Sequence, residues 1–357
     1  MRAAVMYDVD DIRIEERAVP VLEAGDALVR TAASGVCSGD LMPWYVRKKA
    51  PFVFGHEPSG TIVAFGGEPP SRRDGVAFAL GDRVFAHHHA PCFACAACAR
   101  GAFVHCATWR STALDPGGMA EYFRVPRANL VDTLPLPPAM SFADGSLVEP
   151  LACVVKSLRR AFPAELGRRP ETVADPSALA GKTLYAIGAG VMGAMHVALA
   201  AALGATVFVS DFHVARRALA RDLGAAAAWH PAAALAELAR VSGGALADAV
   251  VCGPGNPAAL AHAVDAAAAD GTVLMFTPIA PDERFVLDQS RAYFRDVRLV
   301  SSYSCGPDDT RDALAATARG VVSAARLGAV PFAFPAVGAA YAAMAGADVV
   351  KAIVTFG

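Results

Sequence analysis

The 357-residue sequence lacks a strong charge imbalance, a charged tail, an internal repeat and a low-complexity segment. Lys and Arg number 32 against 34 Asp and Glu, so the formal net charge is -2 at pH 7. Proteins that bind nucleic acid carry a basic patch or a high isoelectric point. The near balance, with a pI of about 6.5, therefore argues against nucleic acid as a partner.

Long apolar runs are also missing. The mean hydropathy is +0.38, but alanine supplies most of the excess. The run 193–203 contains His196 and ends at Gly204, far short of the roughly 20 residues that a bilayer requires. The first residues, MRAAVMYDVDD, hold too short an apolar stretch for a secretory signal. We therefore expect a cytoplasmic protein that does not enter a membrane.

Two kinds of sequence pattern divide the chain. Residues 1–138 combine short apolar runs with Gly, Pro and charges, which is typical of a β-rich region. From Lys182 onward, short apolar runs such as TLYAIGAG and TVFVSD alternate with alanine-rich helical stretches. Continuous apolar strands separated by helices favour a parallel sheet covered on both faces. The length is sufficient for two domains.

A glycine-rich turn, GAGVMG, lies between a strand-like run and an expected helix. It fits the G-x-G-x-x-G pattern of dinucleotide-binding folds. Gly188 permits the tight turn, Gly190 lets the backbone approach a pyrophosphate, and Gly193 allows close helix packing. The helix start faces the phosphates. The other residues expected at the cofactor are Val191 and Met192.

Asp211 stands at the end of the next strand-like run, TVFVSD. A carboxylate at this position accepts hydrogen bonds from the adenosine ribose and repels a 2'-phosphate. Arg216 and Arg217 lie nearby and are the kind of residue that accommodates such a phosphate. The balance of these residues favours NAD over NADP.

Four of the eight cysteines fall close together in one loop, as Cys92, Cys95, Cys98 and Cys106. A structural zinc site takes four tetrahedral ligands and leaves no open position, so the spacing predicts a structural zinc lobe at about residues 90–107. Buried thiols or an iron–sulfur cluster are the alternatives. Histidines flank the loop and are expected on the surface or around the metal: His87, His88, His89 and His105. Cys252 and Cys305 are expected to pack in the interior.

Three further motifs carry metal-ligand chemistry. Cys37 lies in SGVCSGD, His56 and Glu57 lie in FGHEPSG, and Glu149 and Cys153 lie in VEPLAC. Each residue alone is more often part of a core than a ligand. Together, a thiolate, an imidazole and a carboxylate form a candidate zinc triad with one position open for substrate.

The order of these motifs, ending with GAGVMG and Asp211, resembles the zinc-containing medium-chain alcohol, polyol and sugar dehydrogenases over essentially the whole chain. The resemblance implies an α/β protein with a GroES-like β-rich catalytic domain, residues 1–155 and 302–357. A Rossmann domain with a doubly wound parallel sheet, residues 156–301, is inserted into it. The resemblance also implies a homodimer or homotetramer acting on a small-molecule substrate, with two zinc ions per chain, one catalytic and one structural.

The same resemblance implies roles at the catalytic zinc. Cys37 and His56 are ligands, and Glu149 is the third, with Cys153 one helical turn later as an alternative. Glu57 lies beside His56 and can approach the metal. Asp40 is expected to orient a ligand or an arginine.

The implied reaction is hydride transfer between an alcohol and NAD, which gives a ketone or aldehyde while zinc polarises the oxygen. Gly39 and Met42 occupy positions where family members carry proton-relaying Ser or Thr and His residues. A reductase of an activated C=C or C=N bond, which needs no such relay, is therefore an alternative. A non-catalytic, dinucleotide-binding redox sensor is an alternative of another class.

Overall fold

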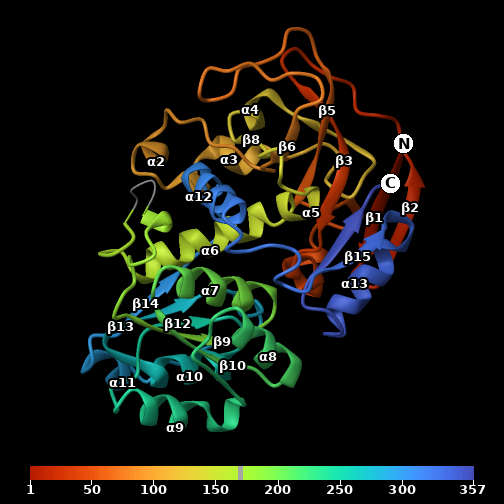
Figure 1. Ribbon diagram of the computed structural model, residues 1–357. Helices are drawn as coiled ribbons and strands as arrows, with labels where there is room; N and C mark the ends of the chain where they lie inside the picture. The colour runs from red at the N-terminus through yellow and green to blue at the C-terminus, as the bar shows by residue number, and fades with distance from the viewer. Residues whose placement is uncertain (168–171) are drawn as a thin grey trace. The chain divides into compact units, whose positions relative to one another are not determined.

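The computed structural model describes residues 1–167 and 172–357, which form two compact units (Figure 1). The first unit combines Met1–Ala152 with Cys305–Gly357, and the second is Cys153–Ser304. Both ends of the chain therefore belong to the first unit. No helix in the part of the chain that the structure describes is long and apolar enough to cross a membrane.

Two β-sheets form the first unit. The larger sheet has the order β15-β16-β3-β5-β6-β8, and β7 pairs with β3. Its strands are β3 (Ala27–Gly35), β5 (Pro58–Phe65), β6 (Arg83–Ala86), β7 (Tyr122–Val125), β8 (Thr133–Pro135), β15 (Val330–Ala333) and β16 (Ala352–Thr355). The smaller sheet contains β1 (Arg2–Asp8), β2 (Asp11–Glu16) and β4 (Phe52–Val53).

The last segment of the chain completes the larger sheet. β16 pairs antiparallel with β3, and β15 pairs parallel with β16. In β3, Ala27 and Val29 are buried and pack with Ile62 and Phe123. Leu28, which lies between them on the strand, is less buried, as the two-residue repeat of a strand requires.

Short helices connect these strands. They are α1 (Pro43–Val46), α2 (Ala96–Ala99), α3 (Ala107–Ser111), α4 (Arg127–Leu130), α5 (Phe142–Gly145), α12 (Pro307–Ala318) and α13 (Val337–Ala345). The cysteine-rich loop has its own small cluster of buried side chains, in which Cys98 and Cys106 pack with Val104 and Trp109. α6 (Val148–Ala161) begins in the first unit, with Pro150 in its first turn where no backbone donor is needed, and continues into the second.

A six-stranded parallel sheet of order β11-β10-β9-β12-β13-β14 is the centre of the second unit. Its strands are β9 (Thr183–Ile187), β10 (Thr206–Ser210), β11 (Ala227–Trp229), β12 (Ala247–Cys252), β13 (Ala267–Met275) and β14 (Arg298–Ser301). The central strands are almost wholly buried, which explains their continuous apolar sequence.

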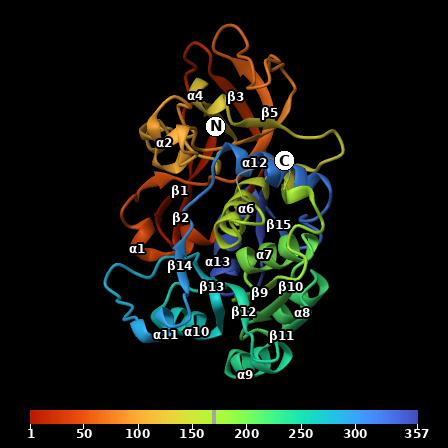
Figure 2. The ribbon, with the colours of Figure 1, turned by 90° about the vertical axis from the view of Figure 1, so that its left-hand side faces the viewer.

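Helices cover both faces of this sheet. α7 lies on one face, and α9 and α10 lie on the other, in both Figure 1 and Figure 2. The helices are α7 (Val191–Ala202), α8 (Val214–Asp222), α9 (Pro231–Val241), α10 (Pro257–Ala266) and α11 (Gln289–Tyr293). The sequence prediction of a β-rich region combined with a doubly covered parallel sheet is confirmed.

Candidate functional site: two donor clusters and a dinucleotide turn

The four cysteines of the loop face one another in the first unit. All four sulfur atoms lie within 4.8 Å of one another. Separations are 4.0 Å for Cys92–Cys98, 3.6 Å for Cys95–Cys98 and 3.6 Å for Cys92–Cys106. Four sulfurs at 2.3 Å from a tetrahedral zinc ion stand roughly 3.8 Å apart. The loop therefore has the dimensions of a closed tetrahedral site.

Backbone donors surround these sulfurs. The N–H of Cys92 donates to Cys106 Sγ at 3.4 Å, and that of Ala94 donates to Cys92 Sγ at 3.5 Å. Burial opposes ionisation of Cys106, but backbone hydrogen bonds outweigh it and lower the pKa of this thiol to about 6. Burial raises the pKa of Cys98 to about 12. A metal that binds all four sulfurs must therefore displace protons from some of them.

A second group of donors lies at one end of the β3–β5 ladder. Ser34 of β3 pairs with Pro58 of β5. Cys37 follows β3, and His56 and Glu57 precede β5, so the same ladder brings the three residues together. Their ligand atoms lie within 4.8 Å of one another.

Acidic groups surround His56. Its Nδ1 lies 3.6 Å from Asp40 Oδ2, and Asp40 Oδ2 is buried without a hydrogen-bond partner among the described residues. Burial disfavours a charged imidazole, but Cys37 and Asp40 outweigh this effect and hold the pKa of His56 well above its usual value. Burial raises the pKa of both Cys37 and Asp40. A bound divalent cation would compensate these acidic groups, so the donor set fits a metal.

Glu57 also contacts a residue that the sequence reasoning did not name. Lys351 Nζ donates to Glu57 Oε2 and, at 2.8 Å, to the carbonyl of Val36. Both side chains of the ion pair are almost completely buried. A Cβ on Gly35 would lie 2.0 Å from Glu57 Oε2, so glycine makes room for the pair. The available signal was a lysine inside the apolar run VVKAIV.

Glu149 belongs to an adjacent group. It lies in the first turn of α6, and its ligand atom is within 4.8 Å of ligand atoms of His87 and His88. It is also near enough to His56 to raise the pKa of that imidazole. Cys153 lies one turn later on α6, with its sulfur within 4.8 Å of the Glu149 ligand atom. The structure thus places Glu149 beside, rather than within, the group of Cys37, His56 and Glu57.

Of the histidines expected on the surface or around a metal, His87 is fully buried and His105 is exposed. The Nδ1 of His87 lies 2.6 Å from Asp132 Oδ2, and the Nε2 of His87 lies 3.6 Å from Cys305 Sγ. Burial works against a charged ring, but Cys305 and Asp132 hold the pKa of His87 well above its usual value. Cys305 therefore has a polar contact in addition to the packing that the sequence predicted.

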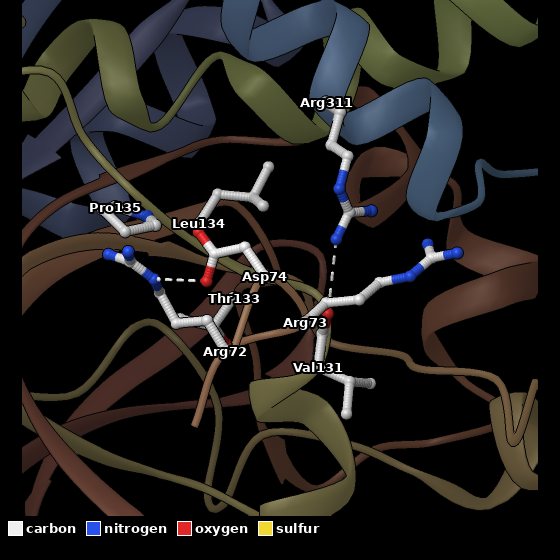
Figure 3. A pocket seen from close by; sticks show the side chains of 8 residues that line it. All are labelled: Arg72, Arg73, Asp74, Val131, Thr133, Leu134, Pro135 and Arg311. Atoms are coloured by element: carbon white, nitrogen blue, oxygen red, sulfur yellow. Dashed lines mark hydrogen bonds and ion pairs between the residues drawn. The ribbon is translucent and has the colours of Figure 1, made fainter. Parts of the chain in front are cut away.

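A pocket of about 270 Å³ lies elsewhere on the first unit (Figure 3). It is lined by Arg72, Arg73, Asp74, Val131, Thr133, Leu134, Pro135 and Arg311. Arg72 pairs with Asp74 at 3.1 Å, and Arg311 donates to the Val131 carbonyl at 3.5 Å. None of the lining residues belongs to a donor group, so this pocket is separate from the candidate metal sites.

In the second unit, the glycine-rich turn has the geometry that its sequence requires. Gly188 has a φ of +88°, which favours glycine, and a Cβ on Gly193 would lie 1.9 Å from the Gly188 carbonyl oxygen. α7 begins directly after Gly190, at Val191, and Met192 lies in its first turn. The turn therefore presents a helix start whose first N–H groups are available to an anion.

Asp211 is fixed beside this turn. Its carboxylate accepts hydrogen bonds from the backbone N–H of Ala189 at 2.8 Å and of His213 at 2.7 Å. Arg217 donates to the Asp211 carbonyl at 2.7 Å and is turned toward the backbone. Arg216 Nη1 lies 3.8 Å from where a Cβ on Gly190 would be, so the positively charged Arg216 guanidinium lies next to the glycine-rich turn.

Comparison with known proteins agrees with this arrangement. Residues 23–137 match the model of the alcohol dehydrogenase GroES-like domain, and residues 191–319 match that of the zinc-binding dehydrogenases. The chain is 32% identical over 296 residues to D-altritol 5-dehydrogenase of Agrobacterium fabrum, covering 82% of this chain and 80% of that protein. The chain belongs to the zinc-containing medium-chain dehydrogenase superfamily.

Two further relatives support this family assignment. Sorbitol dehydrogenase of Bacillus subtilis is 30% identical over 276 residues, covering 74% of this chain and 71% of that protein. A solved zinc-binding dehydrogenase of Sinorhizobium meliloti, bound to NADP, is 25% identical and superposes with a TM-score of 0.82 over 99% of this chain and 98% of that chain. The chain itself is therefore an oxidoreductase of the alcohol and polyol dehydrogenase type that uses a nicotinamide dinucleotide. Its GroES-like and Rossmann-type domains confirm the predicted fold.

Proposed function

We propose that the protein is an NAD-dependent zinc dehydrogenase that oxidises a secondary alcohol, polyol or cyclic alcohol to the ketone or aldehyde, and catalyses the reverse reduction. The observation that carries the proposal is the group of Cys37, His56 and Glu57. It supplies one sulfur, one nitrogen and one oxygen donor, a set suited to a catalytic zinc ion. The polyol dehydrogenases among the relatives support a hydroxylated substrate.

Each residue of the donor group has a defined task in this proposal. Cys37 and His56 would hold the metal together with the carboxylate of Glu149, with Cys153 as an alternative to Glu149. Glu57 would lie beside His56 and could approach the metal, so one position stays open for substrate. Asp40, whose Oδ2 lies 3.6 Å from His56 Nδ1, would orient His56 by its charge. Zinc bound here would polarise the alcohol oxygen and lower its pKa. The four-cysteine loop would hold a second, structural zinc ion.

The second unit supplies the coenzyme site. The backbone turn around Gly190 would lie close to the pyrophosphate, and Asp211 would bind the adenosine ribose. The fixed carboxylate of Asp211 supports NAD, because a 2'-phosphate there would meet a negative charge. The NADP-bound relative and the nearby Arg216 are the opposing observations, so both coenzymes belong in the test. Bound NAD would accept the hydride from the alcohol carbon.

The deciding experiment measures metal content and turnover on the same preparation. We expect about two zinc ions per chain. We also expect secondary alcohols or polyols to reduce NAD, which is measured by the absorbance of the reduced nicotinamide. Cys37→Ala should lose about one zinc ion and the turnover. Reduction of an activated alkene or imine without any alcohol oxidation would favour the reductase alternative. Full activity without zinc would contradict the proposal.

We also propose a homodimer or homotetramer in the cytoplasm. β14 is an edge strand of the six-stranded sheet in the second unit. In the segment before it, the exposed fractions of Val286, Tyr293 and Phe294 are 88%, 64% and 81%. An open edge with exposed apolar side chains favours pairing with another chain. All eight cysteines are free thiols, as in a reducing compartment. Sedimentation analysis tests the assembly, since a monomer at all concentrations would contradict it.

A further inference from the structure

We propose that His88 hydrogen-bonds a second hydroxyl group of the substrate, and so selects vicinal diols and polyols over simple alcohols. The inference rests on the proposed function, because it places the substrate at the donor group of Cys37 and His56. It names a specificity-determining residue that the motifs did not assign.

His88 lies against the candidate metal group. It follows β6, and its ring centroid is 5.0 Å from that of His56. Its ligand atom is also within 4.8 Å of that of Glu149. A small molecule bound at the metal group beside His56 would therefore lie close to the His88 imidazole.

Three consecutive histidines occupy this segment, and their nitrogen atoms have different surroundings. His87 uses Nδ1 with Asp132 and Nε2 with Cys305. His89 uses Nδ1 with the carbonyl of Thr112, at 2.5 Å. His88 Nδ1 is buried and has no hydrogen-bond partner among the described residues.

A buried nitrogen atom without a partner is uncommon, because it loses its hydrogen bond to water and gains nothing in return. A substrate hydroxyl would satisfy it, since a hydroxyl both donates and accepts and therefore suits either imidazole tautomer. A methyl or methylene group in the same place would leave it unsatisfied. Sites built to hydrogen-bond a hydroxyl discriminate strongly against analogues that lack one.

Closely related substrates can isolate this contact. The alcohols 2-butanol and 2,3-butanediol differ by one hydroxyl on the carbon next to the reacting one. We would measure kcat/KM for both, and their binding to the zinc-loaded, NADH-bound protein by calorimetry. His88→Phe keeps a ring but removes both nitrogens. His88→Asn keeps a polar group near the position of Nδ1.

In the unmodified protein, 2,3-butanediol should bind and react better than 2-butanol. His88→Phe should lower kcat/KM and affinity for the diol about tenfold to a hundredfold, with 2-butanol changed about twofold or less. His88→Asn should recover part of the diol preference, and zinc content should be unchanged in both variants.

Equal losses for the two alcohols, or an unmodified protein without diol preference, would overturn the inference. Loss of zinc in His88→Phe would overturn it too, because His88 would then act through the metal. Failure of the proposed function looks different: neither alcohol is turned over with NAD or NADP. The binding titration would still decide whether His88 recognises the second hydroxyl.

Discussion

Lys351 and Glu57 form a buried ion pair that joins the last strand region of the chain to the candidate metal group. Lys351 directly precedes β16, and Glu57 directly precedes β5. Their side chains are 0% and 1% exposed. A carboxylate so deeply buried needs a compensating charge, and Lys351 supplies it whether or not a metal is bound.

Removal of Lys351 alone should be strongly destabilising. Lys351→Met keeps an unbranched side chain that is one atom shorter, but leaves the Glu57 carboxylate buried without its partner. Breaking a buried pair in this way costs about 3–5 kcal/mol. We expect that loss in the free energy of unfolding, measured by urea titration.

The matched control is the double variant Lys351→Met with Glu57→Gln. It removes both charges, so it should recover most of the lost stability, because neutral replacements of a buried pair are often tolerated. A double variant as unstable as Lys351→Met alone would show that packing of the lysine chain, rather than charge compensation, is decisive.

Features formed within a short stretch of chain could be predicted from the sequence. The four cysteines are neighbours along the loop, so their spacing already limits how far apart their sulfurs can be. The glycine-rich turn could be predicted for the same reason, because the backbone of one strand–turn–helix segment requires glycine at positions 188 and 193. These local constraints do not depend on how distant segments pack.

Contacts between distant segments could not be predicted in the same way. Lys351 reaches Glu57 across 294 residues of sequence, and Cys305 reaches His87 across 218. No pattern within any of these segments specifies its partner, because each contact arises only when distant segments pack together, as when β16 joins β3 in one sheet beside Lys351. For the same reason, sequence favoured Glu149 as the third ligand, whereas the structure groups the Glu57 carboxylate with Cys37 and His56 and places Glu149 beside them.

Loss of one loop cysteine should remove one metal ion. Cys95→Ser replaces a thiolate by a poor zinc ligand, so zinc content should fall from about two to about one per chain, with a lower melting temperature. Metal analysis of the purified variant measures this. Cys252→Ala is the control, because Cys252 is a buried thiol outside the donor groups and should leave the zinc content unchanged. Unchanged zinc in Cys95→Ser would refute the structural site.

The charge of Asp211 should decide coenzyme preference. Asp211→Asn keeps the shape and one acceptor oxygen for the turn but removes the charge that repels a 2'-phosphate. The ratio of kcat/KM for NAD to that for NADP should fall about tenfold or more. Asp222→Asn, an exposed charge on α8, is the matched control and should leave the ratio unchanged. An unaltered ratio in Asp211→Asn would assign the selectivity to other groups such as Arg216.

His196 should make the stability of the second unit depend on pH. Its Nδ1 lies 2.7 Å from the Met192 carbonyl, and its Nε2 lies 2.6 Å from the Ser157 hydroxyl. A carbonyl can only accept, so Nδ1 donates to Met192, and Nε2 of the neutral ring is left as an acceptor beside the Ser157 hydroxyl, whose Oγ also lies 2.7 Å from the Val154 carbonyl oxygen. Burial lowers the pKa of His196 to about 4, from an unfolded value of 6.5.

Between these two pKa values the unfolded chain binds a proton that the folded chain does not, so stability falls as the pH is lowered. From pH 7 to pH 5 this histidine should cost about 2 kcal/mol of unfolding free energy. In His196→Gln, which offers an amide donor and acceptor but does not titrate, the decrease over the same interval should be smaller by about that amount. Urea titrations at the two pH values measure the difference. Parallel decreases in the two proteins would mean that other groups cause the acid sensitivity and that His196 is protonated without loss of its hydrogen bonds.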